Sequence, residues 1–140
     1  MIRFTVLGDP IGKGRPKFST VNGFAKAYTP ARTTNYENLV RLSFQQQCNK
    51  VPYKQGEFLA ADITAFFQIP KSISKKKRDL MADGRLFPTK KPDCDNIAKA
   101  VLDALNGVAY YDDSQIVCLA VRKMYSDTPR CEIIIRRLGE

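Results

Sequence analysis

The order of strand-like and helix-like segments along the 140 residues is the feature that most restricts the fold of this chain. Strand patterns fall at residues 2–7, 58–69, 115–125 and 130–138, and helical patterns fall at residues 30–49, 75–82 and 96–105. Only the turn Ser126-Asp127-Thr128-Pro129 separates the last two strand segments, so we expect them to form an antiparallel hairpin. Together these segments predict a single α+β domain over residues 1–140, with a mixed sheet of about four strands and helices packed on it.

Local signals predict the ends of several elements. Thr29-Pro30 is typical of an N-cap followed by a first-turn proline, and it opens the helix over 30–49. Ser74 is the expected N-cap of the basic helix over 75–82. Residues 8–29 hold about three prolines or glycines per ten residues, which predicts a long loop. The apolar side of the first helix carries Tyr36, Leu39, Val40 and Phe44.

The charge of the chain narrows the choice of partner. Lys and Arg total 23 against 14 Asp and Glu, and the formal net charge of +9 suits a polyanionic partner. No apolar run approaches the roughly 18 residues of a membrane span, so no membrane partner is expected. The chain has no histidine and its four cysteines form no Cys-x-x-Cys pair, which argues against a zinc site and a histidine-based catalytic triad.

Carboxylates are concentrated in one stretch of this basic chain. Residues 93–113 hold five aspartates and a single lysine, Lys99. Like charges gathered in one place cost free energy unless a positive group neutralises them, so a divalent metal acting on a phosphodiester is the economical explanation. Mg²⁺ takes oxygen ligands and keeps several waters, so two or three carboxylates suffice. The candidates are Asp93, Asp95, Asp112 and Asp113.

Each of these aspartates also has a purely structural interpretation. Asp95 or Asn96 can be the N-cap of the following helix, although a single cap leaves Asp93 unexplained. Asp112 and Asp113 can close a turn before a strand. Adjacent residues that enter a strand point to opposite faces, so only one of this pair is expected at a metal site.

Asp95, Lys99 and Asp103 are spaced i, i+4 and i+8, which gathers them on roughly one helical face. The structural interpretation is an exposed ion pair worth only a few tenths of a kcal/mol. In the functional interpretation, Lys99 faces the same phosphate that the metal holds. Asp103 lies two turns further along the helix, and we expect a structural role for it.

Two basic segments supply candidate phosphate contacts, with a solvated, solubilising surface as the alternative. Residues 71–91 carry eight Lys or Arg against two Asp. The segment 12–18 adds cations and two glycines that would let the backbone approach a phosphate. Its spacing does not match a P-loop, so no nucleotide cofactor is expected. The candidate DNA-binding residues are Lys13, Arg15, Lys17, Lys75, Lys76, Lys77, Arg78, Lys90 and Lys91.

A family resemblance is carried by the run Asp93-Cys94-Asp95-Asn96-Ile97-x-Lys99-Ala100-x-Leu102-Asp103-Ala104-Leu105 and by the later run Asp112-Asp113-x-Gln115-Ile116. Over residues 91–125 the chain resembles the RusA family of Holliday-junction resolvases, which occur in bacteria and are often carried by prophages. The segment Gly-Lys-Gly-Arg-Pro-Lys at 12–17 is similar to the phage-associated branch. The resemblance implies a small α+β homodimer that cuts four-way DNA junctions with Mg²⁺ or Mn²⁺.

Carried over by position, the resemblance implies metal-binding catalytic carboxylates at Asp93, Asp95 and Asp113, with Asp112 beside them, and a catalytic lysine at Lys99. It therefore predicts a Mg²⁺-dependent endodeoxyribonuclease of DNA recombination and repair, encoded by a bacterium or a phage and located in the cytoplasm with the nucleoid. The chain departs from the family pattern in the long basic insert before Asp93, which affects contacts to DNA rather than the chemistry.

Two other classes of protein stay open from the residues alone. One is a non-catalytic DNA-binding accessory protein, although capping does not require so many acids together. The other is a small metal-dependent phosphohydrolase of nucleotides, although a mononucleotide leaves most of the positive charge unused. A four-way junction has two scissile strands related by two-fold symmetry, so one carboxylate cluster per chain predicts a C₂ dimer. Apolar candidates for its interface are Phe66, Phe67, Val117 and Leu119.

Overall fold

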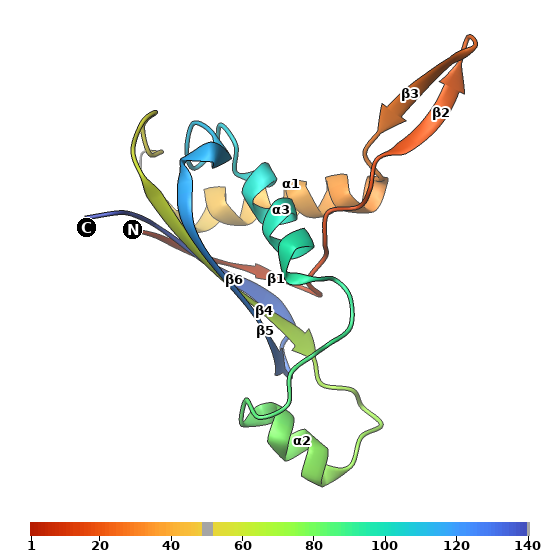
Figure 1. Ribbon diagram of the computed structural model, residues 1–140. Helices are drawn as coiled ribbons and strands as arrows, with labels where there is room; N and C mark the ends of the chain where they lie inside the picture. Colours follow the sequence, from red (N-terminus) through yellow and green to blue (C-terminus); the bar gives the residue numbers. More distant parts are fainter. Residues whose placement is uncertain (49–51, 140) are drawn as a thin grey trace.

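Four strands form the main sheet, in the order β1-β6-β4-β5 (Figure 1). The computed structural model describes residues 1–48 and 52–139. The main sheet consists of β1 (Ile2–Leu7), β4 (Leu59–Gln68), β5 (Ile116–Ser126) and β6 (Arg130–Arg137). The other elements are the helices α1 (Ala31–Gln47), α2 (Lys75–Ala82) and α3 (Cys94–Ala104) and a hairpin of β2 (Lys17–Val21) and β3 (Phe24–Tyr28). The expected α+β fold with a mixed sheet of four strands is confirmed.

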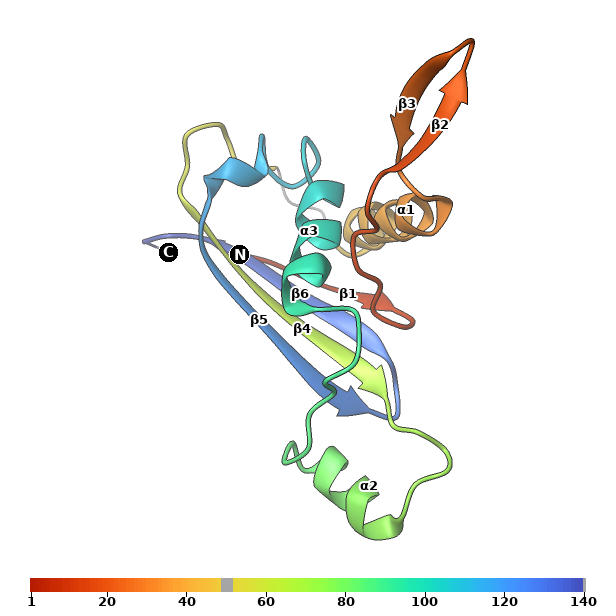
Figure 2. The ribbon, with the colours of Figure 1, turned by 45° about the vertical axis from the view of Figure 1, so that its right-hand side comes forward.

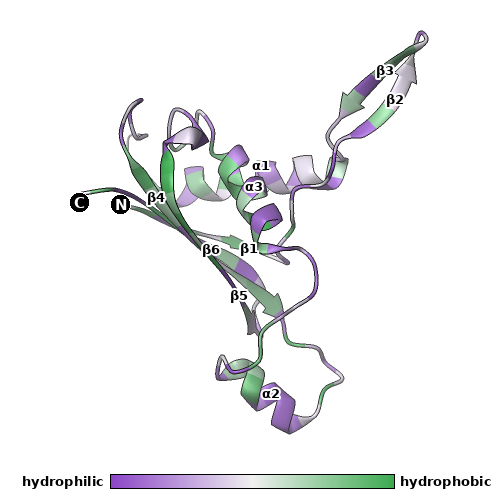
Figure 3. Cartoon of the chain, viewed as in Figure 1, coloured by the Kyte–Doolittle hydropathy of each residue, from purple (hydrophilic) through white to green (hydrophobic). Residues whose placement is uncertain are grey.

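The core lies between the main sheet and two helices, α1 and α3, which cover one of its faces (Figures 1 and 2). Alternate residues of β1, namely Ile2, Phe4 and Val6, are buried in this core. From α3, Ile97 and Val101 enter the core at a spacing of one helical turn. Figure 3 shows hydrophobic residues along the main sheet and a hydrophilic stretch on α2. Burial of these periodic positions explains why their pattern predicts the elements.

The predicted hairpin of the last two strands is wrong. β5 and β6 are antiparallel in direction but do not pair, because β4 lies between them, parallel to β5 and antiparallel to β6. The turn after Ser126 crosses the end of β4, where Gln68 pairs with Ser126 and Phe66 pairs with Arg130. Two strand spacings amount to roughly 10 Å, which the short connection can span. The central position gives the apolar strand β4 hydrogen-bonded neighbours on both edges.

The predicted loop over 8–29 is wrong in its second half, where β2 and β3 form an antiparallel hairpin. Its turn residues Asn22 and Gly23 have φ of 52° and 83°, which is the geometry of a two-residue hairpin turn. The Asn-Gly pair was therefore a usable signal that the density of Pro and Gly obscured. The hairpin projects away from the main sheet (Figures 1 and 2).

The start of α2 agrees with its local signal, whereas the start of α1 does not. Ser74 caps α2, since its hydroxyl accepts a hydrogen bond from the Lys77 N–H at 3.3 Å. The first helix begins at Ala31, so Pro30 rather than Thr29 occupies the N-cap position. Leu39 is 39% exposed and lies outside the core. Within residues 1–48 and 52–139, no helix combines the length and the apolar character that a membrane span needs.

Candidate functional site

The first turn of α3 presents two exposed carboxylates. Asp93 occupies the N-cap position, but its side chain makes no capping hydrogen bond. Asp95 lies in the first turn, so neither Asp95 nor Asn96 is the N-cap. The capping interpretation therefore does not account for either carboxylate, and both are exposed to a ligand.

A groove of about 680 Å³ opens beside Asp93. Its walls come from the segment 10–15, from the start of α1 and from the residues that lead into α3. We call this cavity the basic groove, after its charged lining residues Lys13, Arg15, Arg32, Lys91 and Asp93. Four cations and one carboxylate in a single groove suit a phosphate that meets an acidic reaction centre.

Two glycines let the segment 12–14 lie tightly against both helices. A Cβ on Gly12 would lie 2.8 Å from Cβ of Pro92, and a Cβ on Gly14 would lie 2.8 Å from Oγ1 of Thr33. The N–H of Gly14 donates to that same hydroxyl at 2.9 Å. These glycines therefore serve close packing of the chain against α1 and α3, whereas the sequence had predicted close approach to a phosphate.

Lys13 joins this segment to the acidic residues of both helices. Its ammonium group lies 2.6 Å from Glu37 on α1 and 3.3 Å from Asp103 on α3. Partial burial by itself lowers the pKa of Lys13, but the carboxylates of Glu37 and Asp103 outweigh it, so the pKa lies above its usual value. Lys13 is thus neutralised within the protein, and Arg15 and Arg32 are the more accessible cations of the basic groove.

Asp103 also lies beside Asp113, with the two carboxyl groups within hydrogen-bonding reach. Partial burial and then the neighbouring Asp103 raise the pKa of Asp113 above its usual range. The backbone N–H of Asp113 donates to Oδ1 of Asn106 at 2.8 Å, which holds the two acidic residues together. Burial, followed by the carboxylates of Asp113 and Asp103, also raises the pKa of the Tyr110 hydroxyl.

Asp112 has a different role from its neighbour. Its carboxylate accepts a hydrogen bond from the Ser114 N–H at 2.9 Å and caps a 3₁₀ turn, Asp113–Gln115. Hydrogen bonding to Ser114 lowers the pKa of Asp112. The turn interpretation of Asp112 is therefore confirmed, and the adjacent Asp113 lies beside Asp103 of α3.

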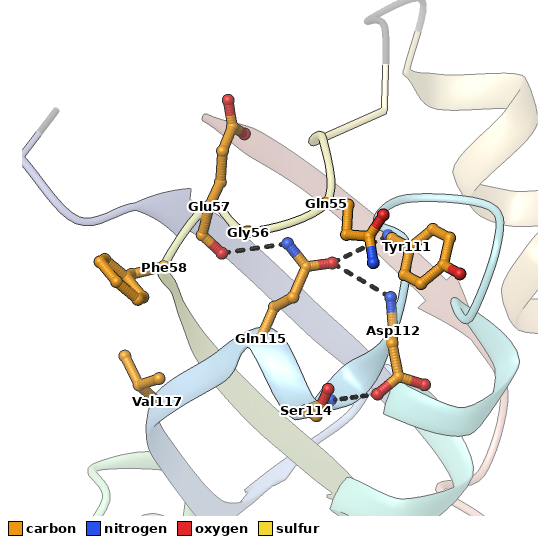
Figure 4. A pocket seen from close by; sticks show the side chains of 9 residues that line it. All are labelled: Gln55, Gly56, Glu57, Phe58, Tyr111, Asp112, Ser114, Gln115 and Val117. Atoms are coloured by element: carbon orange, nitrogen blue, oxygen red, sulfur yellow. Dashed lines mark hydrogen bonds between the residues drawn. The ribbon is translucent and has the colours of Figure 1, made fainter.

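Gln115 holds this loop in place through its side-chain hydrogen bonds. It lines a pocket of about 360 Å³. Figure 4 shows the residues that line this pocket. The side-chain carbonyl of Gln115 accepts from the N–H groups of Tyr111 and Asp112 at 3.0 and 3.1 Å. Its amide donates to the backbone carbonyls of Lys54 and Glu57 at 2.8 and 3.0 Å. A buried amide with four such bonds gives the loop before β5 a defined position.

The acidic residues thus form a row along one side of α3 rather than a single cluster. Eight residues separate Asp95 from Asp103, which corresponds to roughly 12 Å of helix. Lys99 lies between them, exposed, and forms no ion pair with Asp95 or any other described residue. In the part of the chain that the structure describes, no three Asp, Glu, Cys or His side chains are grouped so that they could hold a metal ion.

The remaining candidate DNA-binding residues lie at two ends of the molecule. Lys17 is the first residue of β2 and follows Arg15 of the basic groove by two residues. Lys75, Lys76 and Lys77 are exposed on α2, at the end of the molecule opposite the hairpin (Figure 2). Arg78 donates to the carbonyls of Pro70 and Lys71 and forms an ion pair with Asp127 at 3.6 Å, so it holds α2 in place. Lys90 and Lys91 are exposed on the segment that connects α2 to α3.

The four predicted interface residues fall into two groups. Val117 and Leu119 on the edge strand β5 are 57% and 48% exposed, as a protein interface requires. Phe67 is buried in the core. Phe66 lies under the guanidinium group of Arg130, 4.0 Å from its ring centroid. Of these four residues, Val117 and Leu119 are therefore the two whose exposure suits contact with a second copy.

Two residues of the site were missed from the sequence. Asp103, which was expected to be structural, forms an ion pair with Lys13. Glu37 and Arg32 lie on α1, more than fifty residues from the carboxylate stretch, and no local pattern distinguishes them. Glu37 and Arg32 come close to the carboxylate stretch because α1 and α3 pack together.

Known proteins are similar to this chain over most of its length. The sequence model of the family described as Endodeoxyribonuclease RusA matches residues 8–136. The chain is 40% identical over 140 residues to the uncharacterized protein YqaN of Bacillus subtilis (strain 168), covering 99% of this chain and 97% of that protein. It is 30% identical over 116 residues to the crossover junction endodeoxyribonuclease rusA of Lactococcus phage r1t, covering 82% of this chain and 80% of that protein.

Proposed function

This chain belongs to the RusA family of endodeoxyribonucleases, and on that premise we propose that it resolves four-way DNA junctions in recombination and repair with the help of Mg²⁺. One observation carries the proposal. Asp93, the acidic residue in the lining of the basic groove, immediately precedes α3, and the carboxylates of Asp95 and Asp103 follow along one face of that helix. A phosphodiester that enters this groove therefore meets cations first and carboxylates next.

The residues fit a hard divalent cation by their chemistry. Asp93, Asp95 and Asp113 offer carboxylate oxygens, the donors that Mg²⁺ prefers, and Asp103 adds a fourth beside Asp113. Mg²⁺ uses only one or two protein carboxylates together with water and substrate phosphate, so three ligands need not be gathered before DNA binds. When bound, such an ion activates water and stabilises charge on the phosphate, and Mn²⁺ has the same preferences.

The residues of the chain itself have distinct parts in this proposal. Lys99, exposed between the carboxylates, neutralises charge on the phosphate oxygens. Lys13 is a positioning residue, because its bonds to Glu37 and Asp103 set where the acidic end of α3 lies relative to α1. Arg15, Arg32 and Lys91 bind the phosphate backbone in the basic groove.

The working unit in this proposal is a C₂ dimer, since two symmetric cuts need two sites. The exposed Val117 and Leu119 on the edge strand β5 support an interface on that side of the sheet. Sedimentation of the wild-type protein with and without junction DNA tests this, and a species that stays monomeric in both contradicts the dimer. The proposed activity is carried out where bacterial or phage DNA lies, in the cytoplasm.

A gel assay tests the function. A labelled four-way junction, a linear duplex and a mononucleotide are each incubated with the protein, with and without Mg²⁺. We expect cleavage of the junction alone, and only with Mg²⁺. Binding without cleavage points to an accessory protein, and hydrolysis of the mononucleotide points to a phosphohydrolase.

Single substitutions then test the residues. Asp95→Asn and Asp113→Asn are expected to reduce junction cleavage to background while binding persists or tightens, because removing a negative charge favours a polyanion. Asp83→Asn, at the exposed end of α2, is the matched control and should cleave as the wild type does. Loss of binding in parallel with cleavage by the first two variants would contradict a role for these carboxylates in catalysis.

A further inference from the structure

The hairpin of β2 and β3 exposes aromatic side chains that the fold does not use. Phe24 is 77% exposed, Phe18 is 73% exposed and Tyr28 is 48% exposed, and none of them belongs to the core. An isolated two-stranded hairpin is marginally stable, and exposed aromatic rings add little to it. Exposed aromatic groups on a projecting element are typical of a surface that contacts a partner.

The pairing of the two strands sorts these side chains onto two faces. In an antiparallel pair, residues opposite each other share a face, and alternate residues along one strand share it too. Phe24, Lys26 and Tyr28 alternate along β3, and Tyr28 lies opposite Lys17. We call this the aromatic–cationic face. The other face carries Phe18 opposite Ala27, without a cation.

The charge around the hairpin favours a polyanion. Between Asp9 and Glu37 the sequence contains no acidic residue and five basic ones. They are Lys13, Arg15, Lys17, Lys26 and Arg32. A second copy of this chain presents the same positive charge, so face-to-face pairing of two hairpins is electrostatically disfavoured.

The hairpin is also continuous with the proposed cleavage site. Arg15 lines the basic groove that contains Asp93, and β2 begins two residues later at Lys17. DNA that places a phosphate in the groove therefore has its neighbouring nucleotides beside the hairpin. In Figure 2 the hairpin extends from the end of the molecule where α1 begins.

From these observations, and resting on the proposed function, we infer that the aromatic–cationic face binds unstacked bases at the branch point of the junction. Aromatic rings stack on the face of any base, which makes such contacts independent of sequence. In a linear duplex those faces are covered by neighbouring bases, whereas a branch point interrupts the stack. Phe24 and Tyr28 are four residues apart, roughly 13 Å along the strand, so they contact two different nucleotides with Lys26 at a phosphate between them.

The test measures binding and base stacking separately from cleavage. A four-way junction with 2-aminopurine at the branch point is titrated with protein in EDTA, and affinity and fluorescence are recorded. A linear duplex with the same probe is titrated in parallel. For Phe24→Ala and Tyr28→Ala we expect junction affinity to fall about tenfold each, with loss of the protein-induced change in fluorescence. Affinity for the linear duplex should change less than twofold.

Two variants serve as controls. Phe18→Ala removes an equally exposed phenylalanine from the opposite face of the same hairpin and should bind the junction as the wild type does. Phe24→Trp keeps a stacking ring and should retain the affinity and the fluorescence change. Since all these positions are exposed, unchanged melting temperatures are expected and will exclude misfolding as the cause.

Three outcomes overturn the inference. Equal losses for Phe18→Ala and Phe24→Ala would show that the face has no specific role, and equal losses on junction and duplex would show a contact to phosphate alone. A change from dimer to monomer in Phe24→Ala on sedimentation would identify a second copy as the occupant of the face. If the wild type binds the junction and shows the fluorescence change but does not cut it with Mg²⁺, the proposed function fails while the binding inference stands.

Discussion

The β2–β3 hairpin and the body of the molecule, by which we mean the described residues outside that hairpin, are stabilised in different ways. The body buries residues from β1, α1, β4, α3 and β6 in one core, which joins segments more than a hundred residues apart in the sequence. The hairpin buries none of its described side chains, and its form follows from the local Asn22-Gly23 turn. The body therefore depends on long-range packing, whereas the hairpin is a local structure whose surface is available to a partner.

The two regions also differ in whether their cations form ion pairs. In the body, Lys13 binds Glu37 and Asp103, and Arg122 binds Asp62 at 2.7 Å. On the hairpin, Lys17 and Lys26 form no ion pair with any residue that the structure describes. Cations that are paired with carboxylates of the body support its geometry, whereas unpaired cations on a projecting element suit an external anion.

The largest expected contrast is in global stability. Ile133→Ala removes a fully buried side chain from the central part of the sheet and should lower the free energy of unfolding by about 2–5 kcal/mol. Phe18→Ala, on the exposed hairpin, should change it by less than about 0.5 kcal/mol. Urea denaturation of both variants measures the difference. A hairpin substitution that costs as much as the core substitution would mean that the hairpin folds as part of the body.

Two glycines extend this comparison to backbone packing. Gly12→Ala forces a Cβ to 2.8 Å from Pro92 and should destabilise the body by about 1–3 kcal/mol. Gly23→Ala places a residue with a Cβ at φ +83°, with no atom within 4 Å of that Cβ, so its cost is confined to the turn. We expect an unchanged urea midpoint for Gly23→Ala but faster amide exchange in β2 and β3. Equal shifts of the midpoint would contradict the separation of the two regions.

Removing one cation from each region should have unequal effects. Lys13→Met leaves Glu37 and Asp103 without their shared partner and should cost about 1 kcal/mol, since the pair is partly exposed. Lys17→Met should leave the free energy of unfolding unchanged within about 0.5 kcal/mol. In salt titrations of DNA binding, Lys17→Met should lower the log–log slope by about 0.9, because one phosphate contact is lost. A slope change for Lys13→Met but not for Lys17→Met would reverse these assignments.

The smallest expected effect is a pH dependence confined to the body. In the absence of metal, the pKa of Asp113 is raised, so the folded state holds this proton more tightly than the unfolded chain does. Stability from this group is thus present at low pH and is lost as pH rises from the usual value of 3.8 through the raised pKa. For Asp112, whose pKa is lowered, the contribution is present above 3.8 and is lost as pH falls.

The free energy of unfolding, measured in EDTA at pH values below and above 3.8, tests the direction of each pH dependence. Relative to Asp113→Asn, the wild type should lose stability as pH rises. Relative to Asp112→Asn, it should gain stability as pH rises toward 3.8 from below, which is a lower range than that of the Asp113 effect. The same slope for both comparisons would mean that the two adjacent aspartates share one environment, contrary to the separate partners Asp103 and Ser114.

Several elements were predictable because their information is local. Ser74 and the following residues of α2 contain the cap and the helix together. Residues 59–68 and α3 have periodic apolar positions that are buried in the structure. The carboxylates of Asp93 and Asp95 and the cation of Lys99 follow from their spacing on α3, and the excess of positive charge follows from composition alone. The turn of the hairpin is local as well, because the pair Asn22-Gly23 is itself the signal of a two-residue hairpin turn.

Other features depended on contacts between distant segments. The insertion of β4 between β5 and β6 cannot be deduced from the turn after Ser126, which reports a reversal of the chain but not what lies between its arms. The meeting of Asp103 with Asp113, and of both helices at Lys13, depends on how α1 and α3 pack on the sheet. Periodicity and capping are properties of neighbouring residues, so the sequence by itself determined the elements and their charged faces. Strand order and side-chain proximity depend on which surfaces are buried together, and only the tertiary structure decided them.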